Sequence, residues 1–114
     1  MPAKMTIAIN DGIHHRNADG IEYDLWRIND LTGRVKIKHD RITNENSHVL
    51  VEANTPDDLG SFEIVLFIKD YFENIDRNLN VQDSRMIIPF GMNRIDRDYH
   101  LNISITPTSV QCTL

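Results

Sequence analysis

The sequence predicts an α+β fold: a single antiparallel sheet of about five to seven strands, with one long helix (about residues 56–78) packed on one face. Short segments of alternating apolar and polar residues, separated by turn-forming residues, indicate the strands. A helical spacing of apolar residues in the middle of the chain indicates the helix. With 114 residues, of which 40% are hydrophobic, we expect residues 1–114 to form a single globular domain with its own core.

The expected strands follow the alternation. Met5, Ile7 and Ile9 would share one strand face, and Asn10-Asp11-Gly12 is typical of the hairpin corner after them. Further alternating runs lie at residues 21–25, 35–37, 48–52 and 99–106. In the last run, polar side chains occupy every second position, which predicts a sheet with one buried and one solvent-exposed face. These polar residues are His100, Asn102, Ser104 and Thr106.

The expected helix begins at Thr55-Pro56-Asp57-Asp58, where Thr55 would be the N-cap, Pro56 the first helical residue, and the two carboxylates would face the positive end of the helix dipole. Apolar residues then recur at helical spacing: Ile64, Ile68, Tyr71, Phe72, Ile75 and Leu79. A strand over residues 62–69 is the alternative, because the run at 64–68 is continuous and β-prone and Gly60 disfavours a helix.

Composition narrows the classes of function. A net charge of −5 argues against binding to nucleic acids and to anionic membranes, both of which require clustered cations. No segment approaches the ~20 apolar residues of a membrane span, so we expect a cytoplasmic protein. The single Cys112 cannot form an internal disulfide. Ile is frequent and Ala scarce, a bias that suggests an AT-rich bacterial or phage genome.

The motifs predict no catalytic residue, no metal site and no cofactor. Glycine-rich phosphate loops and a nucleophile elbow are missing from the sequence. His39 and His48 would face each other if the hairpin turned at residues 43–44, and with Asp40 they would then form a weak metal site; other registers separate them, and ordinary surface histidines are the expectation. We expect the adjacent His14 and His15 to lie in a solvated loop.

Acidic residues on the helix provide the most consistent functional pattern. They predict a docking surface for one basic protein partner, because complementary charge raises the association rate. A small, acidic, motif-free domain fits a protein-binding function, most specifically an immunity- or antitoxin-like inhibitor that covers the active site of a basic, nuclease-type toxin as a monomer or small homodimer. The partner-binding residues expected are Asp57, Asp58, Asp70, Glu73, Asp76 and Trp26.

Two alternatives remain open. The first is a small-molecule-binding domain or small enzyme with an apolar pocket between sheet and helix, where Tyr99 or His100 could act. The aromatic residues of that pocket would be Trp26, Phe62, Phe67 and Tyr71. The second is a homo-oligomeric accessory or structural subunit that associates through an open sheet face, on which Trp26 and Ile28 would form an apolar patch with Glu22 and Asp24 at its rim.

Overall fold

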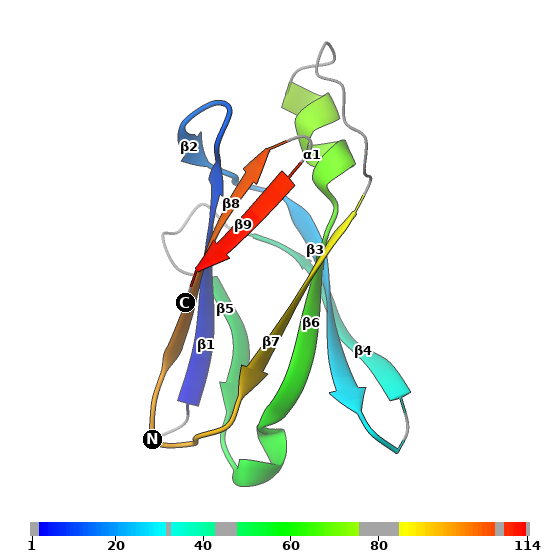
Figure 1. Ribbon diagram of the computed structural model, residues 1–114, viewed down its shortest axis with the longest axis vertical. Coiled ribbons are helices and arrows are strands. Elements are labelled where there is room, and N and C mark those ends of the chain that lie inside the picture. The colour runs from blue at the N-terminus through cyan, green and yellow to red at the C-terminus, as the bar shows by residue number, and fades with distance from the viewer. Residues whose placement is uncertain (1–2, 32, 43–47, 76–84, 107–108, 114) are drawn as a thin grey trace.

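The computed structural model describes residues 3–31, 33–42, 48–75, 85–106 and 109–113. These residues form a sandwich of two sheets, with one short α-helix, α1, at one end (Figure 1). The elements are β1 (Ala3–Asp11), β2 (Arg16–Asn17), β3 (Glu22–Asn29), β4 (Gly33–Arg41), β5 (His48–Ala53), the 3₁₀ turn η1 (Pro56–Asp58), β6 (Gly60–Leu66), α1 (Ile68–Ile75), β7 (Met86–Met92), β8 (Tyr99–Thr106) and β9 (Ser109–Thr113).

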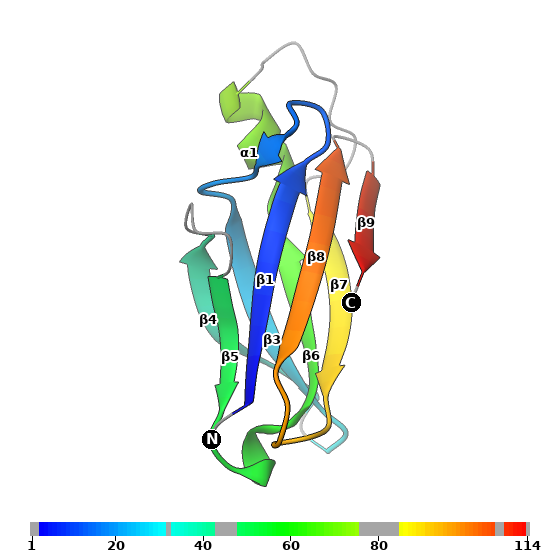
Figure 2. The same cartoon turned by 90° about the vertical axis from the view of Figure 1, so that its left-hand side faces the viewer.

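The first sheet has five strands. Its order is β2-β1-β8-β9, and β5 also pairs with β1. The pairing of β1 with β8 is parallel, with Ile7 opposite Leu101 and Ile9 opposite Ile103, whereas the other pairings of both sheets are antiparallel. The long β1 and β8 run side by side in Figure 2. Strands distant in sequence therefore form the centre of this sheet.

The second sheet has the order β4-β3-β6-β7, and the core lies between the two sheets. Alternate residues of β6, namely Phe62, Ile64 and Leu66, are almost completely buried. Phe62 stacks on Phe90 of β7 with 5.4 Å between ring centroids. From the first sheet, β1 and β8 contribute the alternating residues that the sequence indicated, among them Ile7.

The predicted long helix over about residues 56–78 is wrong. The continuous apolar run forms strand β6, because Phe62, Ile64 and Leu66 fill the core at a period of two, while Val65 on the other face is also buried. The strand alternative for residues 62–69 is correct as far as Leu66. Helix α1 begins only at Ile68, and residues 76–78 lie outside the described part of the chain.

The helix-start signal at Thr55-Pro56 produces a single 3₁₀ turn. The Asp58 carboxylate accepts hydrogen bonds from the backbone N–H groups of Asn54 and Thr55, at 2.9 and 3.1 Å. These two bonds lower the pKa of Asp58. Leu59 is already extended and Gly60 has φ +146°, so the chain leaves the turn as a strand. The predicted fold class, a single sheet with one long packed helix, is therefore corrected to a mostly β structure of two sheets with one short helix.

Candidate functional site

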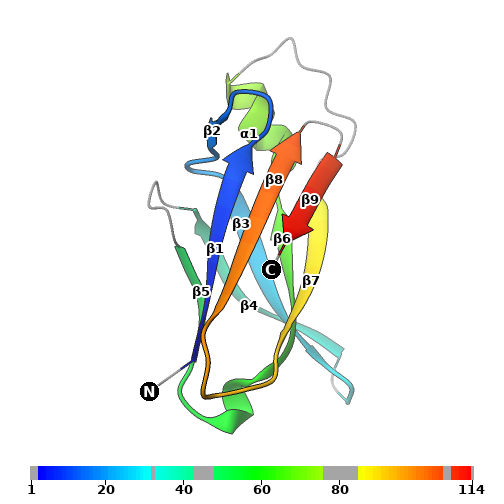
Figure 3. The same ribbon diagram turned by 60° about the vertical axis from the view of Figure 1, so that its left-hand side comes forward.

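The outer face of the β1–β8 pair is a continuous polar surface at the centre of the first sheet. Because side chains alternate along a strand, the residues between the buried ones point away from the core. Figure 3 shows β1, β8 and β9 side by side in this sheet. The exposed or half-exposed register pairs are Thr6 with His100, Ala8 with Asn102, and Asn10 with Ser104.

A hydrogen-bonded chain of side chains crosses this face. Thr6 Oγ1 lies 2.7 Å from His100 Nδ1, and His100 Nε2 lies 3.0 Å from Asn102 Oδ1. The backbone carbonyl of Tyr99 is a more distant partner for the Thr6 hydroxyl, at 3.3 Å. Because the Asn102 carbonyl oxygen can only accept, His100 Nε2 donates to it, and with the proton on Nε2 the ring accepts from the Thr6 hydroxyl at Nδ1.

A shallow cavity of about 320 Å³ lies beside this chain. Its lining combines residues with amide and hydroxyl groups and apolar residues of the two central strands, and Asn102 belongs to both the cavity and the hydrogen-bonded chain. The lining residues carry no formal charge, which suits an uncharged ligand with several hydrogen-bonding groups. They are Ala8, Ile9, Asn10, Asn17, Asn102, Ile103 and Ser104.

Elsewhere in the described part of the chain, buried polar side chains stabilise the fold. The Tyr23 hydroxyl lies 2.8 Å from His48 Nε2 inside the sandwich. Burial, followed by the positive charge of Lys38, lowers the pKa of His48 although Asp40 opposes this, so the neutral imidazole accepts a hydrogen bond from the Tyr23 hydroxyl. Burial likewise raises the pKa of the Tyr23 hydroxyl.

Asp11 is another buried polar residue. Its carboxylate accepts from the backbone N–H groups of Ile13 and His14 with Oδ1, and contacts His14 Nδ1 and the Tyr71 hydroxyl with Oδ2. Burial raises the pKa of Asp11, but the hydrogen bonds together outweigh burial and leave the pKa below its ordinary value. Burial, followed by the hydrogen bond to Asp11 and the negative charge of that carboxylate, raises the pKa of Tyr71 to about 12.

His39 and His48, the two histidines of the weak metal site weighed from the sequence, are separated. His48 is buried against Tyr23, whereas His39 lies on the outer face of the second sheet, 2.5 Å from the Asp24 carboxylate. His14 does not lie in open solvent but against Asp11, while its neighbour His15 is exposed. Within the described ranges, no group of three or more His, Cys, Asp or Glu side chains is placed to hold a metal ion.

The acidic residues predicted to bind a partner do not form one surface. Asp57 and Asp58 belong to the turn between β5 and β6, at the end of the sandwich opposite α1 (Figure 1). Asp70 and Glu73 are exposed on α1. Asp76 lies outside the described residues.

Trp26 is on the outer face of the second sheet, at a third location. The guanidinium of Arg34 lies 4.7 Å from its ring centroid and the Lys36 ammonium 5.9 Å. The surface around Trp26 thus contains the cationic side chains of Arg34 and Lys36, which the sequence analysis did not predict there. The predicted pocket aromatics are also dispersed, because Phe62 is in the core while Phe67 and Tyr71 line a cavity beside α1.

Structural comparison identifies the sandwich as a transthyretin-like fold. (S)-allantoin synthase superposes with a TM-score of 0.83 at 14% identity, over 98% of this chain and 43% of that chain, so this chain spans less than half of that protein. Transthyretin from Sparus aurata gives a TM-score of 0.77 at 14% identity, over 96% of this chain and 93% of that chain. 5-Hydroxyisourate hydrolase from Klebsiella pneumoniae superposes with a TM-score of 0.74 at 15% identity, over 97% of this chain and 91% of that chain.

At these sequence identities the comparisons show the fold and not the activity. No protein-family model and no curated protein sequence matches the chain. The similar structures include a hydrolase and a synthase, as well as a transthyretin solved in complex with thyroxine. Among the described residues, no helix is long and apolar enough to cross a membrane.

The prediction of an immunity- or antitoxin-like inhibitor is wrong. It depended on one long acidic helix, which the structure replaces by strand β6 and a helix of 8 residues. The similar structures are a synthase, a hydrolase and transthyretin, and none of them is named as an immunity protein or antitoxin. Sequence reasoning did identify the alternation at 99–106 that exposes His100 and Asn102, but not that β1 would pair with it in parallel and complete the polar face.

Proposed function

We propose that this protein is a small-molecule-binding domain of transthyretin-like fold, whose ligand lies on the outer face of the β1–β8 pair. The observation that carries the proposal is the cavity beside Asn102, whose lining combines amide and hydroxyl side chains with apolar residues and carries no formal charge. Amide side chains both donate and accept hydrogen bonds, so they fit a ligand in which carbonyl and N–H groups alternate. The ligand class is therefore a small, uncharged heterocycle with ring amides.

The names of the similar structures point to the same class. (S)-allantoin synthase and 5-hydroxyisourate hydrolase are named for nitrogen-rich, carbonyl-bearing heterocycles. A site of this kind gains little from long-range charge attraction, so its selectivity would depend on the matching of donors and acceptors. Asn10, Asn102 and Ser104 are the side chains we expect to contact the ligand.

Calorimetric titration with allantoin, a stable cyclic ureide, tests the binding function. Asn102→Ala and Ser104→Ala should each weaken binding about 5- to 10-fold, the effect of one lost hydrogen bond of ~1 kcal/mol. Ser61→Ala, an exposed serine of β6 on the other sheet, is the matched control and should bind as the unchanged protein does. A panel of ring amides that shows no saturable binding, or equal affinities for all variants, would contradict the proposal.

Hydrolysis of a ring amide on the same strand face, next to the cavity, is a second candidate, favoured by the Thr6–His100–Asn102 chain. A hydroxyl on an imidazole that is oriented by a third group is the arrangement of an activated nucleophile. The Thr6 proton would pass to His100 Nδ1 as Oγ1 bonds to the carbonyl carbon. The ring C–N bond would then break, the leaving nitrogen taking the proton, and water would hydrolyse the resulting ester.

Thr6→Val separates the two candidates. It removes the hydroxyl at nearly constant volume, so it should abolish turnover of a ring amide and leave its affinity within about 2-fold if hydrolysis occurs. Turnover is followed by the loss of the ring's ultraviolet absorbance, with thermal melting as the control for folding. Equal turnover by the unchanged protein and Thr6→Val would exclude Thr6 as the nucleophile.

A further inference from the structure

A second and larger cavity, of about 420 Å³, lies at the end of the sandwich that carries α1. Its walls come from β2 and the connection to β3, the last residue of β4, and α1. The two cavities share only Asn17 of β2, and no residue of β1 or β8 lines this one, so it is a separate site.

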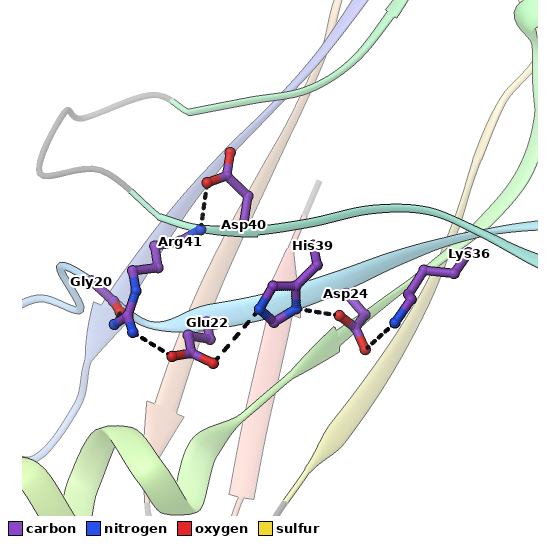
Figure 4. A network of polar contacts seen from close by, with 7 residues as sticks. All are labelled: Gly20, Glu22, Asp24, Lys36, His39, Asp40 and Arg41. Atoms are coloured by element: carbon purple, nitrogen blue, oxygen red, sulfur yellow. Dashed lines mark hydrogen bonds and ion pairs between the residues drawn. The ribbon is translucent and has the colours of Figure 1, made fainter.

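One part of the cavity wall is already neutralised. The Arg41 guanidinium bonds the Glu22 carboxylate and donates to the Gly20 carbonyl oxygen at 3.3 Å. His39 approaches the other Glu22 oxygen to 3.8 Å. Figure 4 shows this network along one face of β3 and β4, with Arg41 and Glu22 directed toward one another. Glu22 and Arg41 therefore line the cavity as a pair and contribute no unpaired charge, while His39 supports Glu22 from outside the lining.

The remaining charges have a distinct pattern. Arg16 bonds the Tyr71 hydroxyl, which in turn donates to the buried Asp11 carboxylate at 3.0 Å, so the guanidinium is held at the cavity wall. In the described part of the chain, Asp19 and Asp70 line the cavity without an ion-pair partner. The cavity thus presents two unpaired carboxylates and one guanidinium that bonds no carboxylate.

An aromatic ring completes the lining. Phe67, the residue that links β6 to α1, is partly exposed and lies edge-on to His39 with 6.0 Å between ring centroids. Cations bind to aromatic faces, and a planar guanidinium does so especially well. A ligand that complements the whole lining therefore has two positive groups, one negative group and a hydrocarbon part.

We propose that this cavity binds a free basic amino acid of the arginine type. Its carboxylate would face Arg16, its two cationic groups would face Asp19 and Asp70, and its guanidinium would lie near Phe67. A dipolar ligand with one net positive charge matches the net negative charge of the unpaired groups. The size of the cavity suits a molecule of this kind.

Titration with L-arginine, followed by NMR chemical shifts and calorimetry, tests the site. Asp70→Asn should weaken binding at least 10-fold. Glu73→Gln, on the next turn of α1, is the control, because Glu73 is exposed, pairs with Lys69 and is not part of the lining. Thermal melting confirms that both variants fold. Asp70→Asn and Glu73→Gln with the same affinity as the unchanged protein would overturn the proposal.

Agmatine, which is arginine without its carboxylate, tests the role of Arg16. The unchanged protein should bind agmatine several-fold more weakly than L-arginine, and Arg16→Gln should bind the two equally. If agmatine binds the unchanged protein as tightly as L-arginine, or if neither saturates at millimolar concentration, the cavity is not a basic amino acid site. Neither result bears on ring-amide binding at the β1–β8 face, which is tested with a different ligand.

Discussion

Asp11→Asn tests whether a buried carboxylate stabilises the end of the sandwich next to α1. Asp11 is completely buried in the last position of β1. Oδ1 accepts from the backbone N–H groups of Ile13 and His14 at 2.9 and 3.0 Å, and Oδ2 lies 2.7 Å from His14 Nδ1 and 3.0 Å from the Tyr71 hydroxyl. Asparagine preserves the shape and the Oδ1 contacts, but it replaces Oδ2 by a donor.

The expected loss follows from these four contacts. A hydrogen bond to a charged group contributes about 1.5–3 kcal/mol, roughly twice the contribution of a neutral one. The variant loses the two contacts of Oδ2 and weakens the two of Oδ1, while His14 and Tyr71 can partly rearrange. We therefore expect Asp11→Asn to lower the free energy of unfolding by about 2–4 kcal/mol at pH 7.

The same carboxylate makes stability depend on pH. Its pKa is lowered in the folded state, so the unfolded chain binds the proton more tightly. The stabilisation is complete above the unfolded pKa of about 3.9 and is lost as pH falls through the lower folded pKa. The stability of the unchanged protein should thus fall more steeply below about pH 5 than that of Asp11→Asn.

Urea unfolding followed by fluorescence, from pH 7 down to pH 3, measures both effects. Asp30→Asn, at an exposed carboxylate after β3, is the matched control and should change stability by less than about 0.5 kcal/mol. A change for Asp11→Asn as small as the control's, with an unchanged pH slope, would refute the role assigned to the buried carboxylate.

Three further predictions concern buried side chains and the glycine at the start of β6. Burial lowers the pKa of His48, so the contribution of the neutral imidazole to folding stability is present above pH 6.5 and is lost as pH falls below that value. His48→Gln should therefore flatten the dependence of the melting temperature on pH between 6.5 and 5. Gly60→Ala should cost about 1–3 kcal/mol in urea unfolding because of its φ of +146°, whereas Gly91→Ala, the control, should cost less. Phe62→Ala should cost about 3–5 kcal/mol through the cavity left beside Phe90, and a cost below 1 kcal/mol would contradict the central place of that ring in the core.

Much of the strand content could be predicted from residues alone. Alternation located β1 and β8, because a residue's neighbours at i±2 share its face whatever the rest of the chain does. The helix prediction failed at 62–66, since a continuous apolar run fits a strand covered on both faces as well as a buried helix. Beyond Ile68 the helical spacing was real, and Tyr71 and Phe72 are buried on one side of α1.

The two candidate sites depended on pairings that no local pattern contains. His100 meets Thr6 only because β1 and β8 pair in parallel across 94 residues of sequence. Arg16 and Asp70 line one cavity only because α1 sits at the end of the sandwich beside β2. The sequence by itself determined which residues alternate between core and solvent, because that period is a local property of the extended chain. Only the tertiary structure decided which strands are neighbours, and hence which exposed side chains lie close enough to act together.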